Sequence, residues 1–422
     1  MASAERQDLL DIYGAGIGAV DGRRRVAQFL HDEVSGTWKQ CPLHVVGIGK
    51  AAVRMAAGAV DVFGSNIVSA LLITKTGHCE PLFDACPGVR CFESAHPVPD
   101  SRSFQAGRLL VSYLEAAPAS ARFIFLISGG ASSLVERAPV GWAASDVVRI
   151  HRWLLGAGLP IGVMNRVRKR VSRLKAGRLA RLLRGRATLN LLISDVPDDD
   201  PRVIGSGLLV QHRQAAIDVG DVRLPRWMTP LLANPPTLAP ASAFEHIRTE
   251  VIAWPGLARA AAAALARQRG YRTAVHDAVL QGDALAVGRR IALQVANDAP
   301  GVQIWSSETT VTLPPEPGRG GRCQSLALAA AMTFAGRADR YLLAAGTDGT
   351  DGPGTVTGAL VDGGTVQRGQ QAGLDAAECL VAADAGTFLE ASHDLLTTGP
   401  TGTNVMDLLV SLKTPADLAE RL

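Results

Sequence analysis

Four short apolar runs in this chain each end directly in a loop of glycine, hydroxyl, acidic or lysine residues. They are 43–47 (LHVVG), 123–127 (FIFLI), 189–193 (LNLLI) and 341–345 (YLLAA). Runs of this length and composition are typical of buried strands. In a doubly wound sheet the carboxyl ends of the strands share one edge, so the loops after them converge there. The pattern therefore predicts an α/β fold with a Rossmann-like, doubly wound, mainly parallel sheet.

The remaining segments predict a second folded part. A chain of 422 residues is long enough for two domains with sizeable cores. A proline-rich, aperiodic stretch at 224–241 indicates a linker or a domain edge. Periodicity predicts one helix over 9–34, and two strands, 302–305 and 309–313, on either side of Ser306, Ser307 and Glu308.

Charge and composition exclude several classes of partner. The net charge of +4 gives no global field that favours nucleic acid or an anionic membrane. No apolar run approaches the ~18 residues of a membrane span, and the first residues do not resemble a secretory signal. The six cysteines show neither a C-x-x-C pair nor metal-ligand spacing. We therefore expect a cytoplasmic protein with reduced thiols and no zinc site.

The stretch 346–353 (GTDGTDGP) carries two carboxylates, Asp348 and Asp351, on a glycine-rich turn after an apolar run. Oxygen ligands of this kind suit Mg²⁺, which usually arrives with substrate phosphates. The alternative is a turn in which the aspartates cap their own backbone. The neighbouring Thr347 and Gly349 are candidate cofactor-binding residues.

A second glycine loop, 47–52 (GIGKAA), joins a strand to a helix, the geometry in which backbone N–H groups face an anion. Its letters fit a dinucleotide fingerprint, but no acidic residue follows the next strand to bind a ribose hydroxyl. Lys50 places a cation in the turn, where a phosphoryl group could use it. Gly47 and Gly49 are candidate cofactor-binding residues; the alternative for Lys50 is a surface lysine beside a tight joint.

Two further loops have the composition of anion-binding nests, and a third presents a carboxylate. The candidate cofactor-binding residues in the nests are Ser128, Gly129, Gly130, Ser132, Thr398, Gly399, Thr401, Thr403 and Asn404. Asp195 follows the strand 189–193, at the sheet edge where open α/β folds keep their chemistry. His96 lies in a proline-rich turn and is interpreted as a structural histidine, with contact to substrate as the alternative.

Residues 165–186 contain ten lysines or arginines and no acidic residue. Apolar residues recur there at helical spacing, so one face packs and the other is basic. No aromatic residues interleave, which argues against nucleic acid. We interpret the segment as the basic edge of a cleft, with Asn165, Arg168 and Lys175 as candidate substrate-binding residues; a solvated charged face is the alternative.

Cations, backbone nests and magnesium-type carboxylates are the parts that phosphoryl transfer needs. The chain also resembles the glycerate 2-kinase family along nearly its whole length. The resemblance rests on VVGIGKAA, SAHPVPD, LISGGASSL, NRVRKRVSRLKAGRLA, LISDVPDDDPRVIGSG, ETTVTL, GRGGRCQSLAL, AAGTDGTDGP and LLTTGPTGTNVMDLL. It implies a kinase that transfers the γ-phosphate of ATP, with Mg²⁺, to the 2-hydroxyl of D-glycerate.

The resemblance also implies an organisation and roles for residues. It implies a Rossmann-like domain at 1–240, a smaller α/β domain of the MOFRL type with a mixed sheet at 241–422, and an active site in the cleft between them. Lys50 and Arg322 match the family's proposed active-site lysine and arginine, with Asp195 as a third catalytic candidate. Glu308 is a candidate for substrate binding. The partners are ATP and a small hydroxy acid, with a homodimer left open.

The chain departs from the family pattern at several positions. Ser306 and Ser307 stand where the family has a glycine pair, and Cys323 and Ser325 replace an asparagine and a glutamate. We expect these changes to reshape the acceptor pocket, unless the positions point away from substrate. The competing hypotheses are an NAD(P)H-dependent hydroxypyruvate reductase and a divergent, non-catalytic nucleotide-binding homologue.

Overall fold

The computed structural model describes residues 3–34, 36–39, 41–80, 88–157, 159, 161–213, 217–220 and 222–415. The chain forms two compact units, each described by itself below. The N-terminal unit comprises Gly22–Ala253 and Gly402–Asn404; the C-terminal unit comprises the residues up to Asp21, Trp254–Thr401 and the residues from Val405 onward. Neither unit is one continuous segment, so this division differs from the predicted 1–240 and 241–422. The predicted position of the active site in a cleft between domains stays a prediction.

The N-terminal unit is built on a six-stranded sheet in the order β3-β2-β1-β4-β5-β6, with every neighbouring pair parallel. The strands are β1 Leu43–Ile48, β2 Ile67–Lys75, β3 Val89–Ser94, β4 Arg122–Ile127, β5 Thr188–Ile193 and β6 Ile247–Ala253. The strand order reverses between β1 and β4, and ligands of such sheets bind outside the carboxyl ends at this point. The predicted Rossmann-like, doubly wound parallel sheet is therefore confirmed for the runs 43–47, 123–127 and 189–193. The fourth run, 341–345, instead forms a strand of the C-terminal unit.

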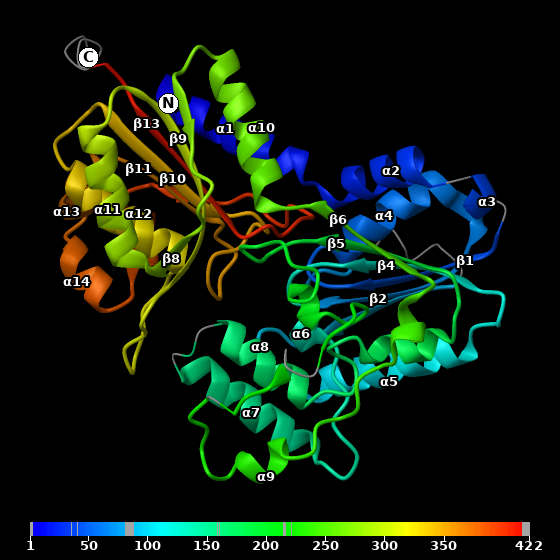
Figure 1. Cartoon of the computed structure of the whole chain (residues 1–422). Helices are drawn as coiled ribbons and strands as arrows, with labels where there is room; N and C mark the ends of the chain where they lie inside the picture. The colour runs from blue at the N-terminus through cyan, green and yellow to red at the C-terminus, as the bar shows by residue number, and fades with distance from the viewer. Residues whose placement is uncertain are drawn as a thin grey trace. The chain divides into compact units, whose positions relative to one another are not determined.

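Helices cover both faces of this sheet (Figure 1). Helices α2 (Gly22–Glu33) and α4 (Ala52–Phe63) lie on one face, and α5 (Ser101–Ala116) lies on the other. The remaining helices are α3 Gly36–Lys39, α6 Ala131–Leu134, α7 Ala144–Gly156, α8 Ile161–Arg170 and α9 Thr229–Leu232, with 3-10 turns at Gly64–Asn66, Arg178–Leu183, Ile204–Ser206 and Ala241–Phe244. Residues of α7, α8 and α9 pack around a separate apolar cluster that includes Val147, Ile150 and Val167.

The predicted single helix over 9–34 is two helices. Helix α1 (Ala4–Ala19) ends at Ala19, and α2 begins at Gly22. Leu9, Ile12 and Tyr13 of α1 join an apolar cluster of the C-terminal unit, whereas the N–H of Gly22 donates to the carbonyl of Gly402 in the N-terminal unit. The helix is interrupted because its two halves are buried in different cores.

The C-terminal unit contains a seven-stranded mixed sheet in the order β12-β11-β10-β13-β9-β7, with β8 also paired to β9. The strands are β7 Thr273–Val275, β8 Leu280–Asp283, β9 Gly301–Thr310, β10 Arg340–Gly346, β11 Gly358–Asp362, β12 Leu395–Leu396 and β13 Asp407–Lys413. Strands β7 and β8 run parallel to β9, and the other pairs are antiparallel. The predicted second α/β fold with a mixed sheet is confirmed.

Two layers of helices cover this second sheet (Figure 1). Helices α1 and α10 (Pro255–Gln268) pack on one face, and α11 (Ala284–Asn297) and α12 (Arg322–Phe334) pack on the other. Three short helices complete the second layer: α13 Thr365–Gln371, α14 Ala376–Val381 and α15 Ala385–Ala391. Helix α12 is buried along most of its length, which fixes the position of Arg322 at its start.

Strand β9 corrects the prediction of two strands around a loop. It runs without a break through Ser306, Ser307 and Glu308. Ser306 and Ser307 are buried, and their hydroxyl groups bond to Arg259 at 2.7 Å and to Asp407 at 3.4 Å. Two serines therefore fit inside a buried strand because distant residues satisfy their hydroxyl groups.

The expectation that the thiols are reduced is wrong for one pair. Cys79, in the loop after β2, forms a disulfide with Cys91 of β3. Cys323 and Cys379 are free thiols. Cys86 lies outside the described residues. The expectation rested on the absence of a recognisable cysteine motif. The spacing between Cys79 and Cys91 matches no such motif, so the sequence does not reveal this disulfide.

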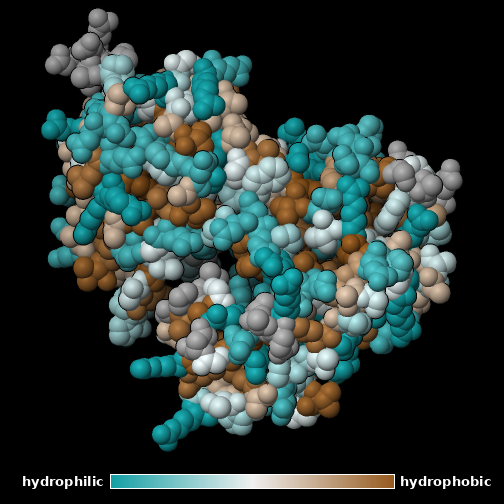
Figure 2. Space-filling model, in the orientation of Figure 1, coloured by the Kyte–Doolittle hydropathy of each residue, from teal (hydrophilic) through white to brown (hydrophobic). Residues whose placement is uncertain are grey.

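Within the described ranges, no helix is both long enough and apolar enough to cross a membrane. Figure 2 shows hydrophobic side chains scattered among hydrophilic ones on the visible face. Large exposed hydrophobic side chains occur singly in different elements, such as Val68 in β2, Leu293 in α11 and Val381 in α14. Isolated residues of this kind are normal on a protein surface.

Candidate functional site

Backbone N–H groups of the loop after β1 are hydrogen-bonded to neighbouring parts of the same unit. The N–H groups of Gly49, Lys50 and Ala51 donate to the Ile73 carbonyl at 3.0 Å, the Gly129 carbonyl at 2.9 Å and the Ser128 hydroxyl at 3.0 Å. These three donors are therefore engaged within the protein, in contrast to the predicted anion nest. The Lys50 side chain stays the loop's candidate for binding a phosphoryl group.

The two predicted glycines of this loop have packing roles. Gly47 lies inside β1, where a Cβ would come within 2.9 Å of Leu72. Gly49 has a φ of +138°, and a Cβ there would come within 2.2 Å of the Ser128 hydroxyl. Both positions require glycine because neighbouring strands and loops approach closely.

Four side chains gather around Gly129 and Gly130, in the loop after β4. A Cβ on Gly129 would meet Asn404 Nδ2 at 2.0 Å and Asp195 Oδ2 at 2.3 Å. A Cβ on Gly130 would meet the His96 ring at 3.0 Å and Lys50 Cγ at 3.4 Å. The fold thus brings together a lysine, a histidine, a carboxylate and an amide at the point where the strand order reverses. We call these four residues the Gly129 cluster.

Asn404 reaches this cluster from the far end of the sequence, because Gly402–Asn404 belongs to the N-terminal unit. Thr403 beside it is 2% exposed, and its hydroxyl has no hydrogen-bond partner among the described residues. In the same region, the hydroxyl of Ser132 is 2.8 Å from that of Ser206. Buried polar atoms are nearly always paired, so the Thr403 hydroxyl is a group that a ligand or water would satisfy.

Gly129→Ala is expected to lower kcat by about 10²-fold with little loss of stability. The new methyl group would displace the Asn404 and Asp195 side chains, and where such groups position a substrate, a displacement of about 1 Å costs activity of this order. The backbone at Gly129 is not left-handed, so alanine adds no conformational strain there. Turnover and thermal unfolding would be measured together. Gly36→Ala, where a Cβ meets nothing within 4 Å, is the matched control. Wild-type kcat in Gly129→Ala would contradict the prediction.

The basic segment after α7 is largely structural. Lys175 is 0% exposed and forms an ion pair with Glu136, which is also 0% exposed. His151 Nε2 lies 3.8 Å from the same carboxylate. Burial lowers the pKa of Lys175 and, with the charges of Lys175 and Arg168, holds the pKa of His151 well below its usual value. Lys175 is therefore a core residue that substrate cannot reach, contrary to the prediction.

Asn165 and Arg168 lie together on α8, where Arg168 Nη1 is 3.4 Å from Asn165 Oδ1. Burial lowers the pKa of Arg168, while the charge of Glu136 acts in the opposite direction. The Nε of Arg168 is buried without a hydrogen-bond partner among the described residues. These two residues stay candidates for substrate binding.

In the C-terminal unit, Arg322 starts α12 and is held by two carboxylates. Its Nε and Nη2 donate to Asp407 at 2.6 and 2.9 Å, and its Nη1 and Nη2 donate to Glu308 at 2.6 and 3.3 Å. Burial alone would lower the pKa of Arg322, but the charges of Asp407 and Glu308 outweigh it and raise the pKa. Arg322 is therefore a fixed cation beside the loop that carries Asp351.

The two predicted metal ligands are used by the protein's backbone. Asp351 accepts N–H bonds from Cys323 at 3.0 Å and Gln324 at 2.8 Å, so it caps α12. Burial raises its pKa to about 6, although the bond from the Gln324 N–H lowers it. Asp348 accepts from the N–H and hydroxyl of Thr350, both at 2.9 Å. Within the described part of the chain, no three His, Cys, Asp or Glu residues are grouped to hold a metal ion.

The hydroxyl-rich loops of the C-terminal unit bind each other. Thr347 Oγ1 donates to the Met406 carbonyl and accepts from the Val405 N–H, and Thr401 donates to the Thr347 carbonyl. The hydroxyls of Thr398 and Thr357 are 2.9 Å apart. A Cβ on Gly349, whose φ is +86°, would meet the Gly399 carbonyl at 2.0 Å. These predicted cofactor-binding residues hold two loops together.

Sequence reasoning missed two residues. His96 was interpreted as structural, yet its ring lies against Gly130 beside Lys50. Asp407 was not singled out, although it is 2% exposed and bonds to Arg322. A carboxylate at the start of a buried apolar run was the signal that could have identified Asp407.

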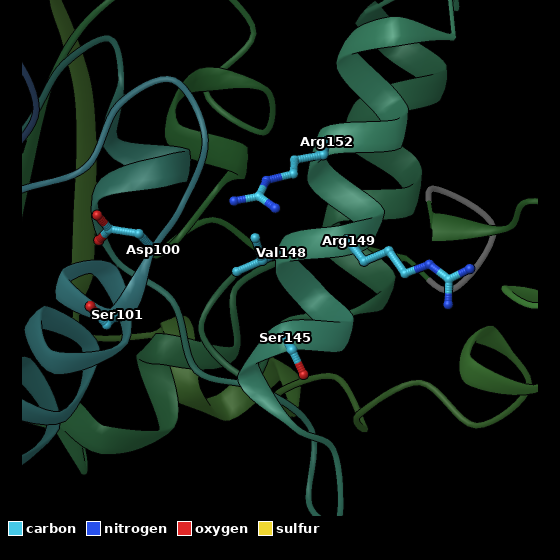
Figure 3. A pocket seen from close by; sticks show the side chains of 6 residues that line it. All are labelled: Asp100, Ser101, Ser145, Val148, Arg149 and Arg152. Atoms are coloured by element: carbon cyan, nitrogen blue, oxygen red, sulfur yellow. The ribbon is translucent and has the colours of Figure 1, made fainter.

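A pocket of about 410 Å³ in the N-terminal unit lies apart from the predicted residues. It is lined by Asp100, Ser101, Ser145, Val148, Arg149 and Arg152. Arg152 points toward Asp100, whereas Arg149 points away from it (Figure 3) and stacks on the Trp227 ring at 3.9 Å. None of the predicted site residues lines this pocket, so it is not assigned to the candidate site.

Two family models match this chain. A domain of unknown function (DUF4147) matches residues 8–224, and the MOFRL family matches residues 301–407. The chain is 34% identical to a putative hydroxypyruvate reductase of Agrobacterium vitis, over 86% of this chain and 97% of that protein. It is 32% identical to the D-glycerate 2-kinase of Thermotoga maritima, over 87% of this chain and 90% of that protein.

A solved structure is similar over the whole length. The crystal structure of glycerate kinase from Thermotoga maritima superposes with a TM-score of 0.81 at 30% identity. The similarity covers 97% of this chain and 100% of that chain.

Proposed function

Because this chain belongs to the glycerate 2-kinase family, we propose that it transfers the γ-phosphoryl group of ATP to the 2-hydroxyl of D-glycerate or a close small hydroxy acid, giving 2-phosphoglycerate and ADP when the acceptor is D-glycerate. The observation that carries the proposal is the Gly129 cluster, in which Lys50, His96, Asp195 and Asn404 meet at the reversal point of a parallel sheet. Such a point is where open α/β sheets bind ligands.

Three members of the Gly129 cluster have a role in this proposal. Lys50 neutralises charge on the transferring phosphoryl group, which is the main task of a phosphotransferase. Asp195 takes the proton of the acceptor hydroxyl, a task that suits a carboxylate. Asn404 donates and accepts hydrogen bonds, so it can orient the acceptor. The two glycines leave room for the reacting groups to approach the backbone.

The C-terminal unit contributes Arg322 in this proposal. A guanidinium binds phosphate or carboxylate oxygens with two parallel hydrogen bonds. Cys323 is 1% exposed and its pKa is raised by burial and by Asp407 and Asp351, so it acts as a neighbour of those carboxylates. Cys323 follows Arg322 on α12, so the change from asparagine at this position alters the surroundings of Arg322.

Magnesium fits this function only as part of the nucleotide complex. Both oxygens of Asp351 already accept N–H bonds from α12, and one oxygen of Asp348 is bonded to Thr350. Mg²⁺ keeps several waters and binds mainly through substrate phosphates and one or two carboxylates. We propose that Mg²⁺ enters with ATP and is held mainly by its phosphates. The ion would neutralise charge on the phosphates.

A reductase is the second candidate, because a relative is named a putative hydroxypyruvate reductase. Its sequence basis was the glycine loop after β1. Three N–H groups of that loop are engaged by Ile73, Gly129 and Ser128, which leaves them unable to bind a pyrophosphate. A dinucleotide-binding loop offers such donors to its ligand, so this observation favours the kinase.

The decisive test is a pair of assays on the same protein. We expect ADP release that requires both D-glycerate, or another small hydroxy acid, and Mg²⁺. We expect no oxidation of NADH or NADPH in the presence of hydroxypyruvate. The reverse result would establish the reductase, and ATP binding without turnover on a panel of hydroxy acids would establish a non-catalytic homologue.

A further inference from the structure

The guanidinium of Arg322 is bound on two different edges. Asp407 binds the edge formed by Nε and Nη2, with both of its oxygens at 2.6 and 2.9 Å. Glu308 binds the other edge, with Oε1 at 2.6 Å from Nη1 and Oε2 at 3.3 Å from Nη2. The edge formed by Nη1 and Nη2 is one of the two that can accept a planar pair of oxygens from a carboxylate or a phosphoryl group.

The two carboxylates differ in their freedom to move. The Asp407 side chain is 3% exposed, and its backbone lies between β9 and β10, paired with Ser307 and Gly346. Ser307 also hydrogen-bonds its carboxylate at 3.4 Å. The Glu308 side chain is 40% exposed and lies near the end of β9. Asp407 is therefore fixed by the sheet, whereas the Glu308 side chain is the more exposed of the two to solvent.

As it stands, this arrangement disfavours an anion beside Arg322. Each of the two carboxylates repels a phosphoryl group or a substrate carboxylate that approaches the guanidinium. The edge occupied by Glu308 is also blocked to another pair of oxygens. One carboxylate has to leave before Arg322 can bind an anion, and the exposed one leaves at the lower cost because water solvates it.

We propose that Asp407 is a positioning residue that keeps Arg322 oriented throughout the reaction, and that Glu308 occupies the anion-binding edge of Arg322 until an anionic group of ATP or of the hydroxy acid displaces it. The proposal rests on the proposed function, because it takes Arg322 as the group that meets the anion. It differs from the sequence-based interpretation of Glu308 as a residue that binds substrate. Glu308 competes with the ligand in the free protein.

The test measures the binding of ATP alone and of D-glycerate alone by calorimetry, in wild type and in Glu308→Gln. Removing the competing charge is expected to tighten binding of one of the two ligands by about threefold to tenfold, the size of a partly exposed ion pair. The ligand that gains affinity is the one Arg322 binds. Glu308→Ala, which removes the side chain altogether, should tighten binding of the same ligand. Glu390→Gln is the matched control, because Glu390 forms an exposed ion pair with Arg319 in the same unit.

Asp407→Asn provides the opposite arm. It keeps the size of the side chain but loosens its hold on the guanidinium, so we expect weaker binding of the same ligand and a kcat lowered by about tenfold or more. In Glu308→Gln, by contrast, KM for that ligand should fall, because the variant no longer carries the charge that competes for Arg322. Tighter binding by Glu308→Gln together with weaker binding by Asp407→Asn supports the proposal. Unchanged or weaker binding in both glutamate variants overturns it, as does no binding of either ligand to wild type and variants.

The two proposals fail in different ways. If wild type turns over a hydroxy acid with ATP but Glu308→Gln binds no ligand more tightly, only this inference is wrong. If no hydroxy acid is phosphorylated, the proposed function is wrong, and the two binding measurements still show whether Glu308 competes for Arg322.

Discussion

Replacing Lys50 with alanine is expected to lower kcat by about 10²-fold or more, because a cation that stabilises charge in the transition state contributes an effect of this size. The lysine stem lies against Gly130 in the Gly129 cluster. Steady-state release of ADP with saturating ATP, Mg²⁺ and hydroxy acid measures the effect. Lys50→Arg keeps the charge and is expected to retain more activity than Lys50→Ala. Arg108→Ala, on the exposed side of α5, is the control for loss of a surface cation.

Arg322→Ala should cause a loss of similar size for the same reason. It also leaves Asp407 buried without its cation, so thermal unfolding has to be followed alongside turnover. Near-wild-type kcat in both Lys50→Ala and Arg322→Ala would show that neither residue stabilises the transition state, and the assignment of the site would then be wrong.

Lys175→Met is expected to lower the free energy of unfolding of the N-terminal unit by about 3–5 kcal/mol. Lys175 and Glu136 are both 0% exposed, so removal of the lysine leaves an uncompensated carboxylate in the core. Denaturant unfolding measures the change. The double variant Lys175→Met/Glu136→Leu should recover much of the loss, because replacing both partners of a buried pair by apolar groups is often neutral.

Arg202→Met is the matched control for this stability measurement, because Arg202 pairs with Asp200 with a side chain that is 61% exposed. It should cost no more than about 1 kcal/mol. A loss below about 1 kcal/mol in Lys175→Met would mean that the buried pair is not a structural element. The segment would then have to be reconsidered as a substrate-binding edge.

The parallel sheet was predictable because the information for it is local. The runs 43–47, 123–127 and 189–193 became β1, β4 and β5, and the loops after β1 and β4 meet as the doubly wound pattern requires. The strand β9 was not predictable in this way. Two adjacent serines are typical of a loop. The residues that bond their hydroxyl groups, Arg259 and Asp407, lie 47 and 100 residues away in the sequence.

The sequence predicted which residue types form the candidate site. It did not predict which of their polar groups are hydrogen-bonded within the protein. Sequence places glycine, serine and aspartate at the ends of strands, yet it does not show whether their polar groups are already paired. Asp351 illustrates the difference, because both of its oxygens accept N–H bonds from α12. Lys175 is a different example. A lysine in a basic run is expected to be exposed, and only the structure shows that Lys175 lies in the core beside the buried Glu136.

The placement of Gly402–Asn404 in the N-terminal unit limits how the two parts of such a protein can be exchanged by recombination. The two family models match separate stretches, 8–224 and 301–407, which suggests two exchangeable modules. Yet Asn404 of the second stretch lies against Gly129 of the first, and α1 of the first stretch packs in the core of the C-terminal unit. If two related proteins recombined at a single point between the two stretches, each unit would contain a buried segment from the other parent. We therefore expect substitutions in the buried segments of one stretch to be matched by substitutions in the other.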